Sequence, residues 1–302
     1  MSFSADLKAE LCTIASEPCC LKAEAFGLLL FGRSFSAHEI SFLTEFSCVA
    51  ARYCELIAEL TGVNPVIQCS KAGNSKIIVE SAADRRRILE FFGYSGKEIS
   101  LRVNFSNFEN ITEDECCFKA FVRGAFLACG SISNPEKEYH LEFSVSKQKL
   151  CTDLLKVIDE AGLKAKSLTR NGAYVLYCKE ADSIEDFVGA MGATNAFLSI
   201  MQYRAIKTVK NKVNRQLNFE SANMSRIINA GLRQVELIKE ILSQVRPEDM
   251  TEDLAELCRI RLDNPELSLD DIGKLMTPPI SRSAVSRRIK KLEEIAAELK
   301  QK

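Results

Sequence analysis

Hydrophobic and polar positions follow the same succession twice in the N-terminal part of the chain. Each copy opens with a short apolar helix that closes at a glycine, followed by a strand and an amphipathic helix. A further strand and a last short helix complete the copy. The first copy comprises residues 23–35, 40–46, 49–60 and 76–80 and a helix that closes at Gly93. The second comprises residues 122–132, 139–145, 149–160 and 173–178 and a helix that closes at Gly192.

Glycines mark the same three places in both copies. The pairs Gly32 and Gly130, Gly62 and Gly162, and Gly93 and Gly192 are separated by 98, 100 and 99 positions. Three matching landmarks predict a tandem duplication of the type αββαββα. We expect left-handed helix caps at Gly32 and Gly130. Strands at 99–105 and 167–168 would complete the two sheets.

The C-terminal third has a helical pattern throughout. Apolar residues at helical spacing predict one helix over 222–242 and another over 252–262, which ends before Asn264-Pro265. Ser268 is placed to cap a third helix, whose first turn holds Asp270 and Asp271. The periodic apolar positions of the first helix are Ile227, Ile228, Leu232, Val235, Ile238 and Leu242.

The last helix combines an apolar stripe with a basic face. Five basic and no acidic residues fall between positions 281 and 291, after a break at Pro278-Pro279. Two helices joined by a tight turn, the second with this surface, predict a helix-turn-helix that lies in the DNA major groove. A solvated amphipathic helix is the alternative. The apolar stripe comprises Val285, Ile289, Leu292, Ala296 and Leu299.

The basic face suggests individual DNA contacts. We expect Arg287 to read a guanine edge and Ser283 and Ser286 to reach bases or phosphates. The residues expected to hold the phosphate backbone are Arg282, Arg288, Lys290 and Lys291.

Charge is distributed unevenly along the chain. Residues 1–194 carry 21 basic and 26 acidic side chains, whereas residues 195–302 carry 19 basic and 15 acidic ones. This asymmetry places nucleic-acid binding in the C-terminal third. A basic linker over 201–221 either contacts phosphates or is a solvated helix or tether. Its cations are Arg204, Lys207, Lys210, Lys212 and Arg215.

Other kinds of site have little support in the sequence. The 12 cysteines include no C-x-x-C, and the adjacent pairs Cys19–Cys20 and Cys116–Cys117 do not form a standard zinc knuckle. We expect reduced thiols in the cytoplasm, and no metal, cofactor or catalytic residue. No apolar run is long enough for a membrane span. The first residues predict a helix capped by Ser4 rather than a leader peptide.

The segment VRGAFLACG, at 122–130, resembles the LAGLIDADG homing-endonuclease motif. That resemblance implies two such helices packed face to face at their glycines, with a metal-binding carboxylate near the end of each. Aligning the closing glycines places Phe31 and Cys129 at the acidic positions. We therefore expect the fold without nuclease chemistry. An endonuclease using Glu24, Glu113 or Asp114 instead is an unfavoured alternative.

Three features together resemble the WhiA family of bacterial transcription regulators: the degenerate repeat, the N-R-x-x-N-x-x-x-A-N run from Asn214 and the motif beginning LDDIGKLM at Leu269. The resemblance covers the whole chain. It implies sequence-specific binding to double-stranded DNA and a role in cell division, chromosome segregation and, in spore formers, sporulation. The expected location is the cytoplasm, in association with the nucleoid. An architectural or division-linked protein with only non-specific DNA binding is the alternative.

The expected fold class is α+β. A duplicated LAGLIDADG-like α/β domain over 1–200, with repeats at 20–100 and 115–195, precedes the linker and an all-α helix-turn-helix domain over 222–302. The acidic N-terminal domain is expected to bind a protein, such as RNA polymerase components or another regulator, or to bind DNA weakly.

Overall fold

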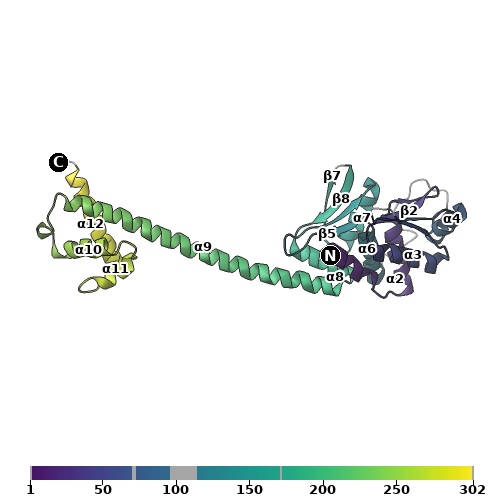
Figure 1. Cartoon of the computed structure of the whole chain (residues 1–302), viewed down its shortest axis with the longest axis horizontal. Coiled ribbons are helices and arrows are strands. Elements are labelled where there is room, and N and C mark those ends of the chain that lie inside the picture. The colour runs from purple at the N-terminus through teal and green to yellow at the C-terminus, as the bar shows by residue number, and fades with distance from the viewer. Residues whose placement is uncertain (1, 70–72, 96–113, 171, 301–302) are drawn as a thin grey trace. The chain divides into compact units, whose positions relative to one another are not determined.

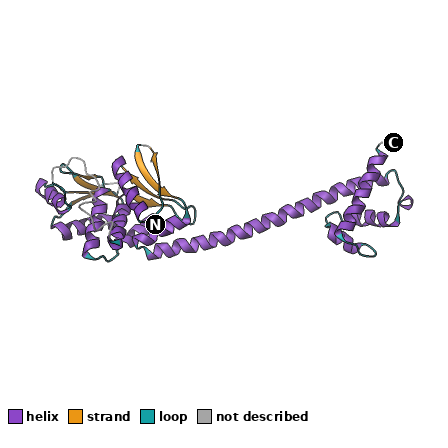
Figure 2. Ribbon diagram, turned by 180° about the vertical axis from the view of Figure 1, so that it is seen from behind, coloured by secondary structure: helices purple, strands orange, loops and turns teal. Residues whose placement is uncertain are grey.

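The computed structural model (Figure 1) describes residues 2–69, 73–95, 114–170 and 172–300. Residue contacts divide the chain into two compact units, Met1–Lys207 and Thr208–Lys302. Each unit has its own hydrophobic core. Figure 2 shows that the strands all belong to the first unit and that the second is built from helices.

The first unit contains two copies of the predicted αββαββα succession. After α1 (Phe3–Cys12), the first copy comprises α2 (Pro18–Leu30), β1 (Ser34–Phe35), β2 (Ile40–Thr44), α3 (Ser47–Thr61), β3 (Val66–Cys69), β4 (Ser75–Ile78) and α4 (Ala82–Phe91). The second comprises α6 (Glu115–Cys129), β5 (Gly130–Ile132), β6 (Leu141–Val145), α7 (Gln148–Glu160), β7 (Lys166–Arg170), β8 (Ala173–Cys178) and α8 (Ala181–Met191). The duplication is therefore confirmed.

Each copy forms one antiparallel four-stranded sheet with the same topology. The orders are β1-β2-β4-β3 and β5-β6-β8-β7. The strand predicted at 167–168 is β7, but its counterpart in the first copy is β3, which the sequence pattern missed. Val66 and Ile67 are 41% and 46% exposed, so β3 has no buried face to create an alternating pattern. The strand predicted at 99–105 lies outside the described residues.

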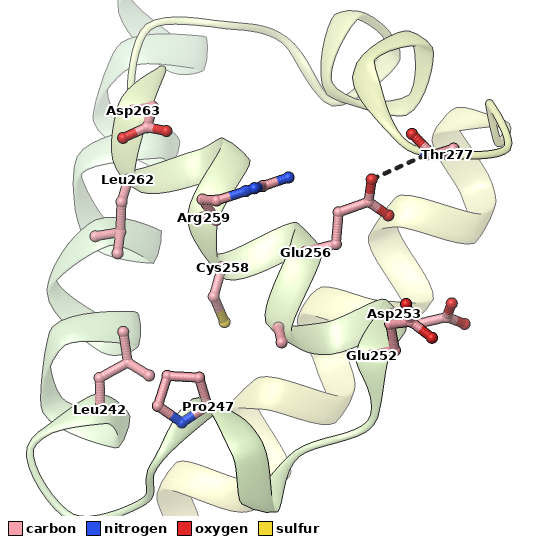
Figure 3. Close-up of a pocket in the computed structure, with 11 residues that line it drawn as sticks. Leu242, Pro247, Glu252, Asp253, Glu256, Cys258, Arg259, Leu262, Asp263 and Thr277 are labelled. Carbon is pink, nitrogen blue, oxygen red and sulfur yellow. Dashed lines mark hydrogen bonds between the residues drawn. The ribbon is translucent and has the colours of Figure 1, made fainter.

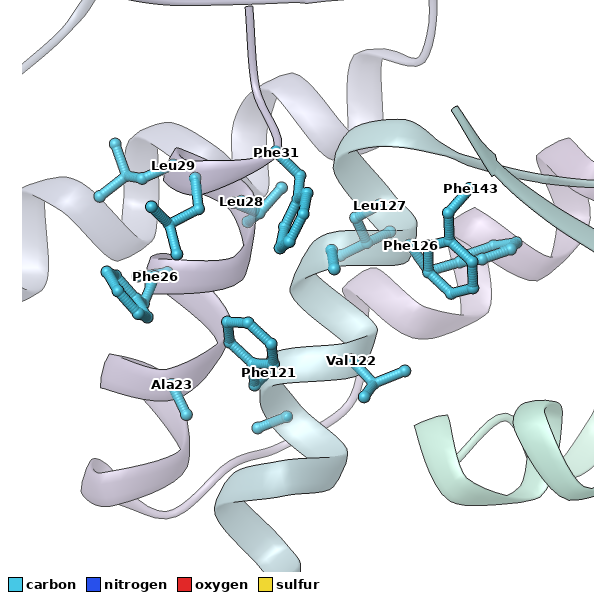
Figure 4. Close-up of a cluster of buried hydrophobic side chains, with 14 of the residues drawn as sticks. Ala23, Phe26, Leu28, Leu29, Phe31, Phe121, Val122, Phe126, Leu127 and Phe143 are labelled. Carbon is cyan, nitrogen blue, oxygen red and sulfur yellow. The ribbon is translucent and has the colours of Figure 1, made fainter. Parts of the chain in front are cut away.

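Helices α2 and α6 pack against each other at the centre of the first unit (Figure 4). A Cβ on Gly27 would lie 2.4 Å from the carbonyl oxygen of Phe121, and one on Gly124 would lie 2.1 Å from that of Glu24. Only glycine permits this approach of two backbones. Gly27 and Gly124 are 97 positions apart, whereas the closing glycines Gly32 and Gly130 are 98 apart. The equivalence set by the helix contact therefore differs by one residue from the alignment of the closing glycines.

Helix ends confirm some expectations and correct others. Gly62, Gly93, Gly162 and Gly192 have positive φ, as caps require. The left-handed caps predicted at Gly32 and Gly130 were wrong: Gly130 is extended and packs against the ring of Phe126, and Gly32 is not among the positive-φ glycines of the described residues. Ser2, not Ser4, caps α1, because its side chain accepts the Ala5 N–H.

The second unit is a small helical domain. Its core contains Ile238 and Ile241 from α9 (Thr194–Leu242), together with residues of α10 (Glu252–Asp263), α11 (Leu269–Leu275) and α12 (Arg282–Leu299). The helix predicted to begin near residue 222 in fact begins at Thr194 and includes the basic linker segment. Leu232, one of the periodic apolar positions, is 49% exposed. Periodicity alone did not show where along this helix packing partners end.

Candidate nucleic-acid interface

Helices α11 and α12 and their connection form the predicted helix-turn-helix. The Ser268 side chain accepts the Asp271 N–H at 3.2 Å and so caps α11. The Ser281 side chain accepts the Ala284 N–H at 3.3 Å and caps α12. A Cβ on Gly273 would lie 2.3 Å from the Ile280 carbonyl oxygen, so glycine allows the turn to pack against α11.

Helix α12 has one buried and one exposed face, as its sequence predicts. Val285, Ile289, Leu292 and Ala296 are buried in the core of the second unit. Burying this stripe fixes the rotation of the helix about its axis, and so fixes which side chains face solvent.

The exposed face carries most of the predicted DNA-binding residues. Arg282, Ser283, Arg287, Lys290 and Lys291 are exposed. In the described part of the chain, no ion pair involves any of these four cations. Their charges are therefore available to a polyanion.

Two predicted positions differ from this exposed set. Arg288 donates a hydrogen bond to Asp253 at 2.7 Å and its side chain is 23% exposed, so it ties α12 to α10. Ser286 is half-buried beside the apolar stripe. The Ser283 hydroxyl lies 2.9 Å from that of Ser281, at the N-terminus of α12.

The linker cations fall into two groups. The Arg204 guanidinium forms ion pairs with Asp182 and Glu185. The Lys207 ammonium donates to the Lys137 carbonyl at 3.2 Å and lies 4.5 Å from the centre of the Tyr139 ring. These contacts attach the start of α9 to the first unit. Lys210, Lys212 and Arg215 are exposed and have no ion pair among the described residues.

A groove in the second unit adds two residues that sequence reasoning did not assign. Asn223 and Arg226, both exposed on α9, line it together with Arg282 of α12. The signal for Asn223 was the N-R-x-x-N-x-x-x-A-N run, which ends at it; Arg226 lies beyond that run.

A second pocket of this unit, beside α10, has an acidic lining (Figure 3). Glu252, Asp253, Glu256 and Asp263 line it, and the only lining cation is Arg259. Glu256 accepts the Thr277 N–H at 3.0 Å and so helps to hold the turn. The excess of carboxylates makes this pocket unsuited to phosphate.

The two positions expected to carry nuclease carboxylates hold no acid. Phe31 is 6% exposed and packs edge-on against Phe121, with ring centres 6.1 Å apart. Burial raises the pKa of the half-buried Cys129 thiol to about 12. In the register set by Gly27 and Gly124, the counterpart of Cys129 is Gly32, which also lacks a ligand.

The charges around these helices also oppose a catalytic metal. Glu24 is fully buried and accepts hydrogen bonds from Arg52 at 2.9 Å and from Arg123 at 2.8 Å. The two guanidinium groups thus neutralise the charge of the Glu24 carboxylate, one of the alternative metal ligands suggested by the sequence. The Lys8 ammonium donates to the Leu127 carbonyl at 3.3 Å near Cys129, and burial lowers the pKa of Lys8.

Comparisons with known proteins identify both parts of the chain. A family model for the WhiA LAGLIDADG-like domain matches residues 118–210, and one for the WhiA C-terminal HTH domain matches residues 213–296. The Probable cell division protein WhiA of Clostridium perfringens is 35% identical over 313 residues, which cover 99% of each chain. The chain belongs to the WhiA family. A WhiA relative of the same name from Ruminiclostridium cellulolyticum is 34% identical, over 99% of this chain and 98% of its own.

The crystal structure of full-length DUF199/WhiA from Thermatoga maritima has a TM-score of 0.60 to this chain, at 24% identity and 99% coverage of both. The WhiA fold is thereby shown: a degenerate LAGLIDADG-like domain precedes a helix-turn-helix domain, and the predicted α+β class is confirmed. Among the residues whose structure is described, no helix is apolar over a length that could cross a bilayer.

Proposed function

We propose that this chain is a DNA-binding transcription regulator that acts in cell division and chromosome segregation, and in sporulation where its host forms spores. The observation that carries the proposal is the face of α12 with exposed, unpaired Arg282, Arg287, Lys290 and Lys291. The relatives' name, Probable cell division protein WhiA, supports the process. The protein would act in the cytoplasm, bound to the nucleoid.

The structure refines the proposed role of each residue. Arg287 would read a guanine edge from α12, with Ser283 and Ser286 near bases or phosphates. Arg282, Lys290 and Lys291 would hold the phosphate backbone, and Arg226 would add a contact beside Arg282. Arg288 would contribute less, because Asp253 already binds its guanidinium.

The rest of the chain would support this contact. Lys210, Lys212 and Arg215 would contact phosphates, whereas Arg204 and Lys207 would anchor α9 to the N-terminal domain. We place the domains at 1–200 and 222–302, joined by a basic segment of α9 at 201–221. The acidic N-terminal domain would bind RNA polymerase components or another regulator.

The protein would not cleave DNA. Phosphodiester hydrolysis in the LAGLIDADG fold needs carboxylates that hold a divalent metal at the ends of the paired helices. Phe31 and Cys129 occupy those positions, and Arg52 and Arg123 neutralise the charge of the buried Glu24 carboxylate.

One incubation separates these possibilities. The purified full chain is mixed with fragmented genomic DNA in Mg²⁺, and both the retained fragments and any new DNA ends are sequenced. We expect retained fragments to share a short motif and to show no new ends. Retention without a shared motif would favour an architectural protein with non-specific binding. New ends at a defined sequence would instead show that a nuclease activity survives.

A further inference from the structure

Two pairs of adjacent cysteines meet at the N-terminal ends of α2 and α6. Cys19 and Cys20 lie in the first turn of α2, and Cys116 and Cys117 lie in the first turn of α6. Their four sulfur atoms lie within 4.8 Å of one another. Sequence spacing alone had argued against a metal site, because each pair lacks the separation of a zinc knuckle; folding brings the pairs together from positions 97 residues apart.

The geometry suits a single tetrahedral ion. Tetrahedral zinc, with zinc–sulfur bonds of about 2.3 Å, spaces its four sulfurs about 3.8 Å apart. The sulfurs of Cys19 and Cys20 are 3.9 Å apart. An iron–sulfur cluster would distribute its four cysteines over two or four iron atoms, so cysteines on different irons would stand further apart than around a single ion. Small adjustments of side-chain torsions would bring the remaining distances to those of zinc.

The pseudo-symmetry of the repeats explains why the four thiols converge. In each helix the cysteines stand eight and seven residues before the contact glycine, Gly27 in α2 and Gly124 in α6. Because the glycines hold the backbones together, equivalent residues two turns earlier are also neighbours. The site is part buried: Cys20 and Cys117 face the core, while Cys19 and Cys116 are exposed.

The helix ends supply the electrostatic environment that thiolates need. Neither N-cap residue, Glu17 of α2 or Asp114 of α6, makes a side-chain capping hydrogen bond. First-turn N–H groups are therefore not bonded to either N-cap side chain, and they lie at the end of each helix that carries the cysteines. The positive ends of two helix dipoles would offset the net charge of −2 that four thiolates and a divalent ion carry, to the extent of about half a unit each.

We propose that Cys19, Cys20, Cys116 and Cys117 bind one structural zinc ion that joins the two repeats at the N-terminal ends of their paired helices. Each thiol loses its proton to solvent as its sulfur binds the ion, and no electron is transferred. Four protein ligands leave no open position for a substrate, so the role is stabilisation. The zinc would act in addition to the glycine contact, which holds the helices further along.

Metal analysis of the full chain tests this proposal. The chain is prepared with reductant and Zn²⁺, dialysed, and its zinc and iron are measured by mass spectrometry. The test variant is Cys19→Ser/Cys116→Ser, which alters only the two exposed ligands. Cys69→Ser is the matched control, because Cys69 is exposed on β3 and outside the cluster. We expect about one zinc ion per chain in the wild type and the control. The affinity for zinc should fall at least about tenfold in the double variant, because losing even a residue that only orients a metal ligand lowers metal affinity by that factor.

Two further measurements do not depend on the variant folding well. Co²⁺ added to the metal-free wild type should produce the visible absorption of a tetrahedral cobalt–thiolate centre, and Zn²⁺ should displace it. A chelator should lower the thermal unfolding midpoint of the wild type, detected by tyrosine fluorescence; all six tyrosines lie in the first unit and the chain has no tryptophan.

Equal zinc content in the wild type and the double variant would overturn the proposal. So would absence of the cobalt spectrum from the reduced wild type, disulfides among these four cysteines under reducing conditions, or iron bound together with sulfide.

Discussion

Individual side chains decide what the helix-turn-helix can recognise. The apolar stripe of α12 is buried in the core, whereas Arg282, Arg287, Lys290 and Lys291 are exposed and have no ion pair with any described residue. Arg288 has the same charge, but its guanidinium forms an ion pair with Asp253 of α10. Residue type alone therefore does not separate the cations proposed to contact DNA from Arg288; the partners of each cation do.

Substitutions on α12 should separate reading of bases from attraction to phosphates. Arg287→Ala should cost about 1–3 kcal/mol of discrimination between the selected motif and a scrambled duplex. Lys290→Ala should weaken binding to both duplexes alike. Fluorescence anisotropy at fixed salt measures both effects. Lys300→Ala removes one charge beyond the end of α12, where Lys300 pairs with Glu240, and should change neither affinity. If Arg287→Ala weakened both duplexes equally, Arg287 would be a phosphate contact.

The buried charge cluster of the first unit should be necessary for its stability. Glu24→Gln would leave Arg123 buried without its counter-charge, which costs about 3–5 kcal/mol when a buried pair loses one partner. Urea unfolding followed by tyrosine fluorescence measures this loss. Glu115→Gln, which breaks an exposed ion pair with Lys119, should leave the midpoint unchanged. A similarly small effect of Glu24→Gln would show that the buried arginines find other partners.

At the level of elements, close backbone packing joins the two repeats. Helices α2 and α6 approach at Gly27 and Gly124, and rings from both helices surround that contact, including Phe26 and Phe121 with centres 6.0 Å apart. The same register brings Cys19 and Cys20 beside Cys116 and Cys117. One helix pair thus explains both the packing and the proposed zinc site.

Added methyl groups should distinguish glycines that packing requires from those it does not. Gly124→Ala would place a Cβ 2.1 Å from the Glu24 carbonyl oxygen and should destabilise the first unit by at least about 1–3 kcal/mol. Gly189→Ala, in α8, would meet the ring of Phe197 in α9 at 3.6 Å, an ordinary van der Waals contact. It should stabilise by about 0.5–1 kcal/mol, because alanine favours a helix. Urea unfolding followed by tyrosine fluorescence compares the stability of the two variants. An equal change in the free energy of unfolding would contradict the close contact of α2 and α6 at Gly124.

At the scale of the whole molecule, one helix takes part in both units. Helix α9 contributes Ala196 and Ile200 to the first core and Ile238 and Ile241 to the second. Between them it is exposed over residues 208–226, a stretch that carries Lys210, Lys212 and Arg215. The charge asymmetry seen in the sequence therefore includes a stretch of helix as well as the helix-turn-helix.

Salt dependence should show which cations of α9 meet DNA. Each phosphate neutralised contributes about −0.9 to the slope of log affinity against log salt. Replacing Lys210, Lys212 and Arg215 together by Ala should reduce the steepness by about 2 to 3. Arg204→Ala should leave the slope unchanged, because Asp182 and Glu185 hold that guanidinium in the first unit. A larger effect of Arg204→Ala than of the triple variant would place the DNA elsewhere.

The sequence by itself determined the duplicated αββαββα succession, the helix-turn-helix and its basic face. Local periodicity encodes these features, because burying one stripe of a helix or strand requires apolar residues at fixed spacing. It failed at β3, which has no buried face, and at the start of α9, where the helix continues beyond both cores. It also misjudged Gly130, whose neighbour Phe126 rather than a left-handed turn requires a glycine.

Only the tertiary structure decided which polar residues act together. Glu24 with Arg123, Arg288 with Asp253, and Cys19 and Cys20 with Cys116 and Cys117 are separated by about 35 to 100 positions. No local pattern reports such pairs, because they depend on the register in which two helices pack. Packing therefore determined which charges are neutralised, which remain free for DNA, and where four thiols meet.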